Sequence, residues 1–449
     1  MEQILEAIIG LQFGDEGKGK IVDKRVNDAL SNGKKTIVIR FQGGCNAGHT
    51  IYAIDKHGNL IEFITHAAPS GLTSNADIAI GPNVAFDPKQ FIKELNLAKD
   101  LFNYDANVFI SERTGILLDY HKRLDAYKEN NKKNIGTTKS GIGPFYIDNA
   151  NRLTRLTLND YVSDNFSNKL KEILEIKSNE LKIIGIDDLN KYHEELVNEH
   201  NPIRKELKNY KSRLEYVLQD YLENGNIIIE GAQGAMLDID MGSIPDVTAS
   251  HLLAPHAFPS LGLPRNKFKI YGVEKIYPTR VGNGLLPTLD EEEFGPMIVK
   301  NSGEFGATTG RMRRVGYPDW VMIKRSVMLN DCDGIYLTRV DNVQDYNLKI
   351  CTAYELNDGI YNEMPLDLSE IKNVIYTNEF KFKLWDGNND LSDALKMDSI
   401  LKEQRMNYVN GKELPNELKE FIKYHDEFVK CPIVGISIGP GRDEIVKLK

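Results

Sequence analysis

Short apolar runs rich in β-branched residues alternate along most of the chain with segments whose apolar residues recur at helical spacing. The clearest unit comes first: an apolar run over residues 4–11, a glycine-rich turn, and apolar positions at helical spacing over residues 22–30. Asn32-Gly33 ends this helix, and a second apolar run covers residues 36–41. This order predicts a β-α-β unit, in which a helix joins two parallel strands.

Further apolar runs predict more strands, at residues 77–80, 107–111, 226–230, 268–273, 334–338 and 432–438. Most of these runs lead directly into glycines or polar residues. Because open parallel sheets bind their ligands beyond the carboxyl ends of the strands, we expect the functional site at these junctions. The pattern as a whole predicts an α/β fold with a mostly parallel, twisted central sheet that is flanked by helices.

A Lys/Glu-rich stretch over residues 163–224 differs from its surroundings. Between Leu207 and Tyr221 its apolar residues recur at i, i+3 and i+4 spacing, which predicts amphipathic helical structure with a solvated charged face. Glycine clusters, by contrast, are spread from residues 14–19 to residues 435–441. If these clusters all belong to one site, residues 1–449 form a single large domain, which is the organisation that we predict.

The composition is that of an ordinary globular protein and excludes several classes. With 41% hydrophobic and 27% charged residues among 449, the chain can bury a large core, which excludes global disorder. A formal net charge of −9 gives no overall positive field, so we expect no nucleic acid and no membrane as a partner. The first residues are acidic where a signal peptide has bases, and no apolar stretch approaches the roughly 18 residues of a membrane span. The four cysteines form no CxxC pair. These features favour a cytoplasmic protein.

A first glycine cluster lies between the first strand and the first helix and consists of Gly14-Asp15-Glu16-Gly17-Lys18-Gly19-Lys20. Backbone N–H groups and the positive end of the helix can converge there on a phosphate. The spacing is P-loop-like, but Ile21 stands where a P-loop has the Ser or Thr that binds Mg²⁺. Two acids would repel a phosphate unless one binds a metal ion or acts as a base. A plain glycine-rich turn with solvated charges is the alternative.

A second cluster follows the second strand and consists of Gln42-Gly43-Gly44-Cys45-Asn46-Ala47-Gly48-His49-Thr50. If the β-α-β prediction holds, this cluster lies beside the first one. The amide of Asn46 can then hydrogen-bond to the edge of a base, and the carbonyl of Gly48 can bind a hard metal ion. The imidazole of His49 can donate a proton. Taken alone, a histidine is more often a hydrogen-bonded structural residue, so both interpretations of His49 stay open.

Together the two clusters resemble the opening of adenylosuccinate synthetases, whose pattern is close to WGDEGKGK followed by NAGHT. Later segments resemble further motifs of that family, and they occur in the family's order. These segments are residues 136–138, 141–144, 230–234, 237–240, 245–248, 279–282, 304–311, 337–341 and 437–442. The resemblance therefore covers essentially the full chain, and it implies the fold of that family.

The resemblance implies a ligase that joins L-aspartate to inosine monophosphate (IMP) with GTP, through a 6-phosphoryl intermediate, on the route from IMP to AMP. Such a reaction needs a base for the N1 proton, a metal ion on the phosphate oxygens, and donors for the developing charge. By the family's pattern, Asp15 is the base and a ligand of Mg²⁺. Gly48 supplies a second metal ligand through its carbonyl, and His49 is the acid on the GTP phosphate.

The same resemblance implies binding residues for each substrate. GTP contacts fall on Gly14, Glu16, Gly17, Lys18, Gly19, Lys20, Gly48, His49, Thr50, Arg313, Arg339, Val340, Asp341, Ser437, Ile438 and Gly439. IMP contacts fall on Asp15, Lys18, Asn46, Ala47, Gly48, His49, Thr138, Gln233, Thr248 and Arg311, with Arg152 contributed by the partner subunit of a homodimer. Aspartate contacts fall on Ala307, Thr308, Thr309, Gly310, Arg311 and Arg313. The carboxylate of Asp341 can accept from the N1 and N2 donors of guanine, a pair that adenine lacks.

The chain departs from the family's pattern in several places. Individual replacements are Phe13 for Trp, Arg339 for Lys, Cys45 for His or Ala, and Lys139-Ser140 for Gly-Arg. The largest departure is the segment of residues 250–263, which lacks the glycine-rich run that usually follows Thr248. This difference predicts an altered wall of the site.

Two other functions are compatible with such a fold. A related ligase can use a guanine nucleotide as acceptor or ATP as donor, but such enzymes change the residue at the base position, so Asp15 favours IMP. A regulatory protein that only binds nucleotides can lose Asp15, His49 or Arg311, and all three are present in this chain.

Overall fold

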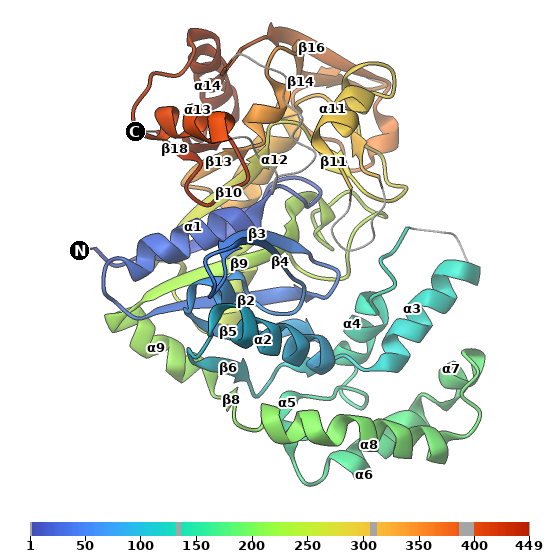
Figure 1. Cartoon of the computed structure of the whole chain (residues 1–449). Helices are drawn as coiled ribbons and strands as arrows, with labels where there is room; N and C mark the ends of the chain where they lie inside the picture. The colour runs from blue at the N-terminus through green and yellow to red at the C-terminus, as the bar shows by residue number, and fades with distance from the viewer. Residues whose placement is uncertain (1, 132–135, 306–311, 386–398, 449) are drawn as a thin grey trace.

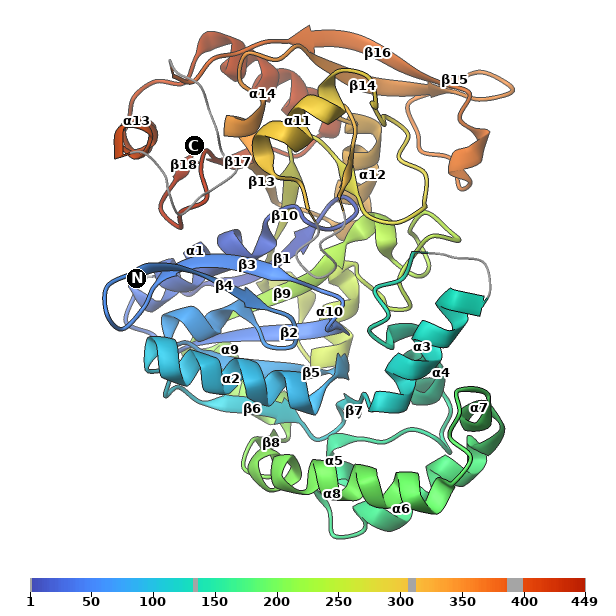
Figure 2. The ribbon, with the colours of Figure 1, turned by 45° about the vertical axis from the view of Figure 1, so that its right-hand side comes forward.

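The central sheet of the computed structural model has 11 strands and carries helices on both faces (Figures 1 and 2). The structure describes residues 2–131, 136–305, 312–385 and 399–448. Along the sheet the strands lie in the order β18-β17-β13-β10-β1-β9-β2-β5-β6-β8, and β7 pairs with β5 at one side. All these pairs are parallel except β17 with β18. The predicted α/β fold with a mostly parallel sheet is therefore confirmed.

The strands of this sheet are β1 (Leu5–Gly10), β2 (Thr36–Gly44), β5 (Asp77–Phe86), β6 (Val108–Ser111), β7 (Gly115–Ile116), β8 (Lys211–Ser212), β9 (Asn226–Gly234), β10 (Lys269–Lys275), β13 (Gly334–Thr338), β17 (Ile433–Ser437) and β18 (Ile445–Lys447). Among the described residues, three small sheets lie outside it. They are β3 (His49–Ile54) with β4 (Leu60–Thr65), β11 (Thr279–Arg280) with β12 (Arg314–Val315), and β14 (Leu348–Glu355) with β15 (Ile360–Tyr361) and β16 (Asn373–Phe380).

The α-helices are α1 (Lys18–Leu30), α2 (Pro88–Phe102), α3 (Asp119–Asn131), α4 (Ile142–Ala150), α5 (Leu158–Val162), α6 (Phe166–Ile176), α7 (Ser178–Ile183), α8 (Leu189–Leu207), α9 (Leu214–Asn224), α10 (Ala254–Leu261), α11 (Phe294–Ser302), α12 (Trp320–Asn330), α13 (Ser399–Val409) and α14 (Asn416–Val429). Short 3-10 helices are η1 (Ser70–Ser74), η2 (Ala235–Leu237), η3 (Arg265–Lys267), η4 (Val340–Val343) and η5 (Leu368–Glu370). Within the described ranges, no helix combines the length and the apolar composition needed to span a bilayer.

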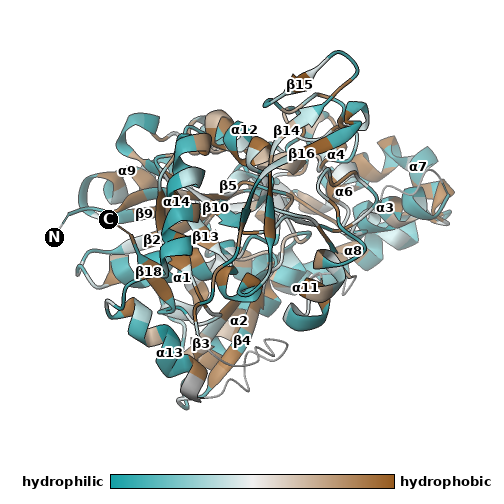
Figure 3. Ribbon diagram, turned by 90° about the horizontal axis from the view of Figure 1, so that it is seen from above, coloured by the Kyte–Doolittle hydropathy of each residue, from teal (hydrophilic) through white to brown (hydrophobic). Residues whose placement is uncertain are grey.

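Alternation along the strands explains why both faces of the sheet are covered. In β1, Ile8 packs on the face that α1 covers, whereas Ala7 and Ile9 belong to the opposite face, which α9, α10 and α12 cover. Because successive residues of a strand point to opposite faces, a strand that is apolar at every position must be buried on both sides. In Figure 3 the central strands are mostly brown and the outer sides of the surrounding helices are largely teal, as this packing requires.

The predicted β-α-β unit is confirmed, with α1 joining β1 to β2, and each further apolar run corresponds to a strand of the sheet. The prediction of helical structure across residues 207–221 is wrong in its middle. The chain leaves α8 at Leu207, forms β8, which pairs with β6, and enters α9 at Leu214. Residues 211–212 pair with the open edge of the sheet at β6 instead of continuing the helix. This pairing gives hydrogen-bond partners to backbone groups that a short polar segment cannot satisfy by itself.

Candidate active site

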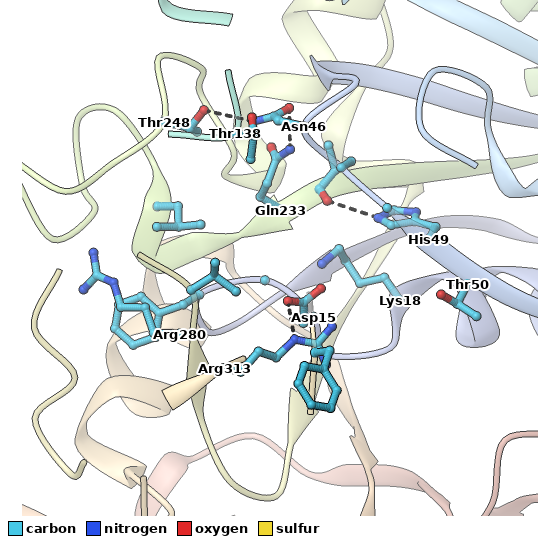
Figure 4. A pocket seen from close by; sticks show the side chains of 18 of the residues that line it. Asp15, Lys18, Asn46, His49, Thr50, Thr138, Gln233, Thr248, Arg280 and Arg313 are labelled. Atoms are coloured by element: carbon cyan, nitrogen blue, oxygen red, sulfur yellow. Dashed lines mark hydrogen bonds and ion pairs between the residues drawn. The ribbon is translucent and has the colours of Figure 1, made fainter. Parts of the chain in front are cut away.

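A cavity of about 890 Å³ opens at the carboxyl ends of β1, β2, β9, β13 and β17. Its walls come from the loops that follow these strands, together with the β3–β4 hairpin and residues from α3 and α4. Chain segments that are distant in sequence meet there, as Figure 4 shows for side chains from both glycine clusters. The cavity therefore lies where an open parallel sheet is expected to bind its ligands.

The first glycine cluster turns sharply between β1 and α1. Gly14, Asp15 and Gly17 all have positive φ, at 92°, 61° and 88°. Side chains other than glycine rarely adopt this left-handed region, so Asp15 occupies a strained position of the kind that is concentrated at functional sites. Asp15 lines the cavity, and α1 begins immediately after the turn with Lys18, so its first N–H groups have no partner within the helix.

Glu16 explains how two acids fit into a phosphate-binding loop. Its carboxylate is fully buried, where it accepts hydrogen bonds from the backbone N–H of Gln12 at 3.1 Å and of Gly14 at 2.8 Å, and from Lys18 Nζ at 2.6 Å. Burial opposes ionisation, but Lys18 and the backbone donors hold the pKa of Glu16 below its ordinary value. The Glu16 side chain thus holds the loop in shape from inside, and Glu16 itself does not line the cavity.

Asp15 and Arg313 form an ion pair at the wall of the cavity (Figure 4). Arg313 Nε donates to Asp15 Oδ2 at 2.8 Å, and its Nη1 donates to Glu304 Oε2 at 2.6 Å. Glu304 is fully buried and also accepts from Lys275 Nζ at 2.8 Å and from the Tyr277 hydroxyl at 2.7 Å. Arg313 is therefore held between two carboxylates, which aims a fixed positive charge at the Asp15 side of the cavity.

His49 begins β3 and is held by a buried carboxylate. Its Nδ1 lies against Glu230 Oε1, and its Nε2 lies 3.1 Å from the carbonyl oxygen of Ala232. Although burial disfavours ionisation, the charges of His49 and Arg40 lower the pKa of Glu230 to about 2. Ser70 donates to the same carboxylate through its N–H and its hydroxyl, each at 2.8 Å. An ionised Glu230 thus fixes the orientation of the imidazole.

A cluster of neutral polar side chains lies at the end of the cavity away from Asp15 and Arg313 (Figure 4). Gln233 Nε2 donates to Asn46 Oδ1 at 2.9 Å, and Asn46 Nδ2 lies 3.5 Å from Thr248 Oγ1. Thr138 lines the same end of the cavity. Amides and hydroxyls both donate and accept, so this cluster suits the edge of a neutral heterocycle and a phosphate oxygen.

Asp341 lies in η4, directly after β13, and it is buried at the cavity wall. Arg405, from α13, is fully buried beside it, with Nη2 3.7 Å from Asp341 Oδ2 and Nη1 3.5 Å from Glu444 Oε1. Lys20 Nζ donates to Ser437 Oγ at 2.7 Å on the same side. Burial lowers the pKa of Lys20 to about 7, although Glu444 and Asp341 act in the opposite direction.

The structure brings most of the predicted site residues together in this one cavity. The predicted residues that line it are Gly14, Asp15, Gly17, Lys18, Gly19, Lys20, Asn46, Ala47, Gly48, His49, Thr50, Thr138, Gln233, Thr248, Arg313, Arg339, Asp341, Ser437 and Gly439. The side chains of Val340 and Ile438, like that of Glu16, are fully buried away from it. Arg152 is exposed in the turn after α4 and does not line the cavity of its own chain. Ala307, Thr308, Thr309, Gly310 and Arg311 lie outside the described residues.

Sequence reasoning missed several residues around the cavity. Arg280 lies inside a segment of recognised pattern, but its part in the site was not predicted: its guanidinium carbon lies 4.4 Å from the centre of the Phe13 ring. The β3–β4 hairpin contributes Tyr52 and Glu62, and its alternating pattern could have predicted it. Arg405 carries no local signal at all, because it lies 64 residues from Asp341 in sequence and only folding brings the two together.

The prediction that residues 250–263 alter the wall of the site is not supported, because no residue of that segment lines the cavity, although the preceding residue Ala249 does. Buried Asp238 accepts from the backbone N–H of Leu252 at 2.5 Å, which turns the chain away from the site. Apolar residues of α10, such as Ala257 and Phe258, then join the core behind the wall. Residues 250–263 therefore contribute to the hydrophobic core and do not line the cavity.

Comparison with known proteins agrees with this geometry. The family model described as adenylosuccinate synthetase matches residues 7–446. The adenylosuccinate synthetase of Geotalea uraniireducens is 39% identical, with 98% of each chain covered.

Solved structures give the same result. The chain is similar to a fully ligated adenylosuccinate synthetase from Plasmodium falciparum, with a TM-score of 0.83, 29% identity, and coverage of 99% of this chain and 100% of the other. It also shares the fold of the cyanophage S-2L succinoaminodeoxyadenylate synthetase, with a TM-score of 0.62, 16% identity, and coverage of 100% of this chain and 96% of the other.

Proposed function

Since the chain belongs to the adenylosuccinate synthetase family and joins L-aspartate to IMP using GTP, we propose that Asp15 is the base of this reaction. The observation that carries the proposal is the place of its carboxylate. It lines the same cavity as the start of α1, which is suited to phosphates, and the amide cluster around Asn46, which is suited to a purine edge. A base that shares one cavity with both regions can act on the purine while the purine faces the phosphate chain.

The first chemical step transfers a proton and then a phosphoryl group. Asp15 takes the proton from N1 of IMP, and the negative charge develops on O6. A bond forms between O6 and the γ-phosphorus of GTP, the bond from that phosphorus to the β–γ bridging oxygen breaks, and GDP leaves with the electron pair. The amine of L-aspartate then attacks C6 and displaces phosphate. Lys18 and His49 line the cavity, and in this proposal they stabilise the charge that spreads over the transferred group.

Arg313 holds the Asp15 carboxylate in place in this proposal. Its Nε donates to one Asp15 oxygen, while its second bond, to Glu304, keeps it from following the carboxylate. The fixed positive charge lies beside the Asp15 carboxylate, where it stabilises the negative charge that develops during phosphoryl transfer. Glu304, Lys275 and Tyr277 are positioning residues, because they act through Arg313.

The cavity also suits a magnesium ion. Asp15 and the carbonyl of Gly48 are hard oxygen donors in residues that both line the cavity, and Mg²⁺ prefers one or two such protein ligands together with substrate phosphates. When bound, Mg²⁺ neutralises charge on the β- and γ-phosphate oxygens. Ile21 in place of the usual P-loop hydroxyl is consistent with a ligand set that lies elsewhere.

The two nucleotides occupy opposite ends of the cavity in this proposal. IMP contacts Asn46, Thr138, Gln233 and Thr248, whereas the guanine of GTP contacts Asp341. The aspartate loop is residues 307–313, with Arg311 engaging a carboxylate. Arg152 reaches the IMP phosphate from the partner subunit of a homodimer, which agrees with its exposure outside the cavity of its own chain.

One assay tests the overall assignment. Purified protein is mixed with IMP, GTP, L-aspartate and Mg²⁺, and the change in purine absorbance is followed while each component is omitted in turn. We expect turnover only in the complete mixture. Turnover without aspartate, with a guanine nucleotide in place of IMP, or with ATP in place of GTP would contradict the corresponding substrate.

Asp341→Asn should weaken the preference for GTP. The amide keeps the size of the side chain, but it cannot accept two hydrogen bonds from guanine, so we expect kcat/KM for GTP to fall about 30-fold. The value for IMP at saturating GTP should stay close to wild type. The matched control is Asp345→Asn, at an exposed position four residues further along the chain, which should behave as wild type. Equal losses for GTP and IMP would contradict guanine recognition by Asp341.

Arg405→Met should act through Asp341. Without the buried guanidinium, the Asp341 carboxylate loses its nearest positive charge, and burial then favours its protonated form. We expect KM for GTP to rise about tenfold, with a larger rise at lower pH and little change in kcat. Arg405→Lys should recover part of the affinity. A pH-independent loss of kcat would show that Arg405 is needed only for folding.

A further inference from the structure

Outside the active site, the structure gathers three metal-ligating side chains at the surface. Asp240 lies in the loop after η2, His251 lies in the stretch before α10, and His256 lies in the first half of α10. His251 Nδ1 is 2.9 Å from Asp240 Oδ2, and the two imidazole rings stack with centroids 4.5 Å apart. One potential ligand atom from each residue lies within 4.8 Å of the other two.

A buried carboxylate holds the two loops that carry these side chains. Asp238 is fully buried, and its Oδ1 accepts from the backbone N–H of Asp240 and of Met241, each at 3.0 Å. Its Oδ2 accepts from the N–H of Leu252 at 2.5 Å, immediately after His251. The backbone N–H of Ile239 donates to the carbonyl of Ser250 at 3.2 Å. The backbones beneath Asp240 and His251 therefore keep a fixed separation, which lowers the entropic cost of closing both side chains on one ion.

We infer that Asp240, His251 and His256 form a binding site for a divalent transition-metal ion, with Zn²⁺ as the best-suited ion. Two imidazoles and one carboxylate form a ligand set that suits zinc, cobalt or nickel, whereas magnesium and calcium prefer oxygen donors throughout. Neighbouring ligand atoms around Zn²⁺ lie about 3.3 Å apart, given bond lengths of about 2.0–2.2 Å. Small rotations of the exposed side chains close the remaining distance.

The side chains are accessible, and they are separate from the catalytic ligands. Asp240 is 58% exposed and His251 is 49% exposed, so water can complete the coordination. None of the three lines the active-site cavity, whereas Asp15 and Gly48 do. The chain between the two loops includes Thr248 in the cavity wall, so a bound ion also ties together the ends of that wall segment.

Zinc binding to the whole protein tests the site. A chromophoric zinc chelator competes with the protein in excess Mg²⁺, which saturates oxygen-rich sites. We expect wild type to take up one equivalent of Zn²⁺ and to unfold at a higher temperature with zinc. His251→Ala and His256→Ala should each weaken binding by at least about tenfold and abolish the thermal shift. The matched control, His57→Ala in the exposed β3–β4 turn, should bind as wild type.

Two further measurements separate this site from other sources of affinity. Asp15→Asn should bind zinc as wild type does, so the result is independent of the proposed catalytic base. The histidine variants should retain ligase activity in the absence of zinc, which shows that they are folded. Equal zinc affinity in wild type and in the His251→Ala/His256→Ala double variant would overturn the site, as would no binding by wild type.

Discussion

Asp15→Asn should lower kcat by about 10²–10⁴, the range expected for losing a general base, while IMP and GTP still bind. The amide has the same shape, and its oxygen can still accept from Arg313 Nε, so the cavity should stay intact. It cannot take the N1 proton, and it is a poorer ligand for Mg²⁺. The measurement pairs kcat from the absorbance assay with calorimetric affinities for both nucleotides.

The matched control for this variant is Asp240→Asn, which makes the same exchange outside the cavity. Assayed without zinc, it should turn over as wild type does. An unchanged kcat in Asp15→Asn would remove Asp15 from the mechanism. A loss of nucleotide affinity equal to the loss of kcat would instead make it a binding residue.

If Arg152 contacts the IMP phosphate as proposed, Arg152→Leu should raise KM for IMP by about 10²-fold, because it removes the charged partner of that phosphate. If Arg152 belongs to the partner's site, a mixture of the two variants recovers activity. In a dimer of one Asp15→Asn chain and one Arg152→Leu chain, one site carries both lesions and the other carries neither. Random pairing of equal amounts therefore gives about a quarter of wild-type activity at low IMP.

The control for the mixing experiment is Arg213→Leu, at an exposed position beside α9, which should leave KM for IMP unchanged. Mixtures that never exceed the sum of the two separate variants would place Arg152 in its own subunit's site, or outside any site. An affinity tag on one variant that co-purifies the untagged second variant from the mixture establishes that subunits have exchanged.

The apolar runs predicted where most strands of the central sheet lie along the chain. The glycine clusters predicted where the cavity lies. Both signals are local. Turn residues and strand ends depend on neighbours in sequence. The fold placed Asp15, Asn46, Gln233 and Thr248 around one cavity because parallel strands end at the same edge. The sequence resemblance supplied the roles of these residues, which the local pattern does not contain.

Contacts between segments that are distant in sequence could not be predicted from these local patterns. Glu16 and Asp15 are adjacent acids in the same loop, yet one is buried against Lys18 and the other enters the cavity. That difference depends on backbone angles at a single turn. Arg405 reaches Asp341 only after α13 has packed, and the segment of residues 250–263 is drawn behind the wall by Asp238. Tertiary packing decided each of these cases.

Isotope scrambling in GTP tests the central claim, that Asp15 makes O6 of IMP the nucleophile for phosphoryl transfer. GTP labelled with ¹⁸O at the β–γ bridge is incubated with enzyme, IMP and Mg²⁺, but without aspartate. Reversible transfer to IMP frees the GDP β-phosphate to rotate, so the label moves to non-bridging positions. We predict scrambling that requires IMP in wild type and is lost in Asp15→Asn. Scrambling at the wild-type rate in Asp15→Asn, or without IMP, would contradict this account.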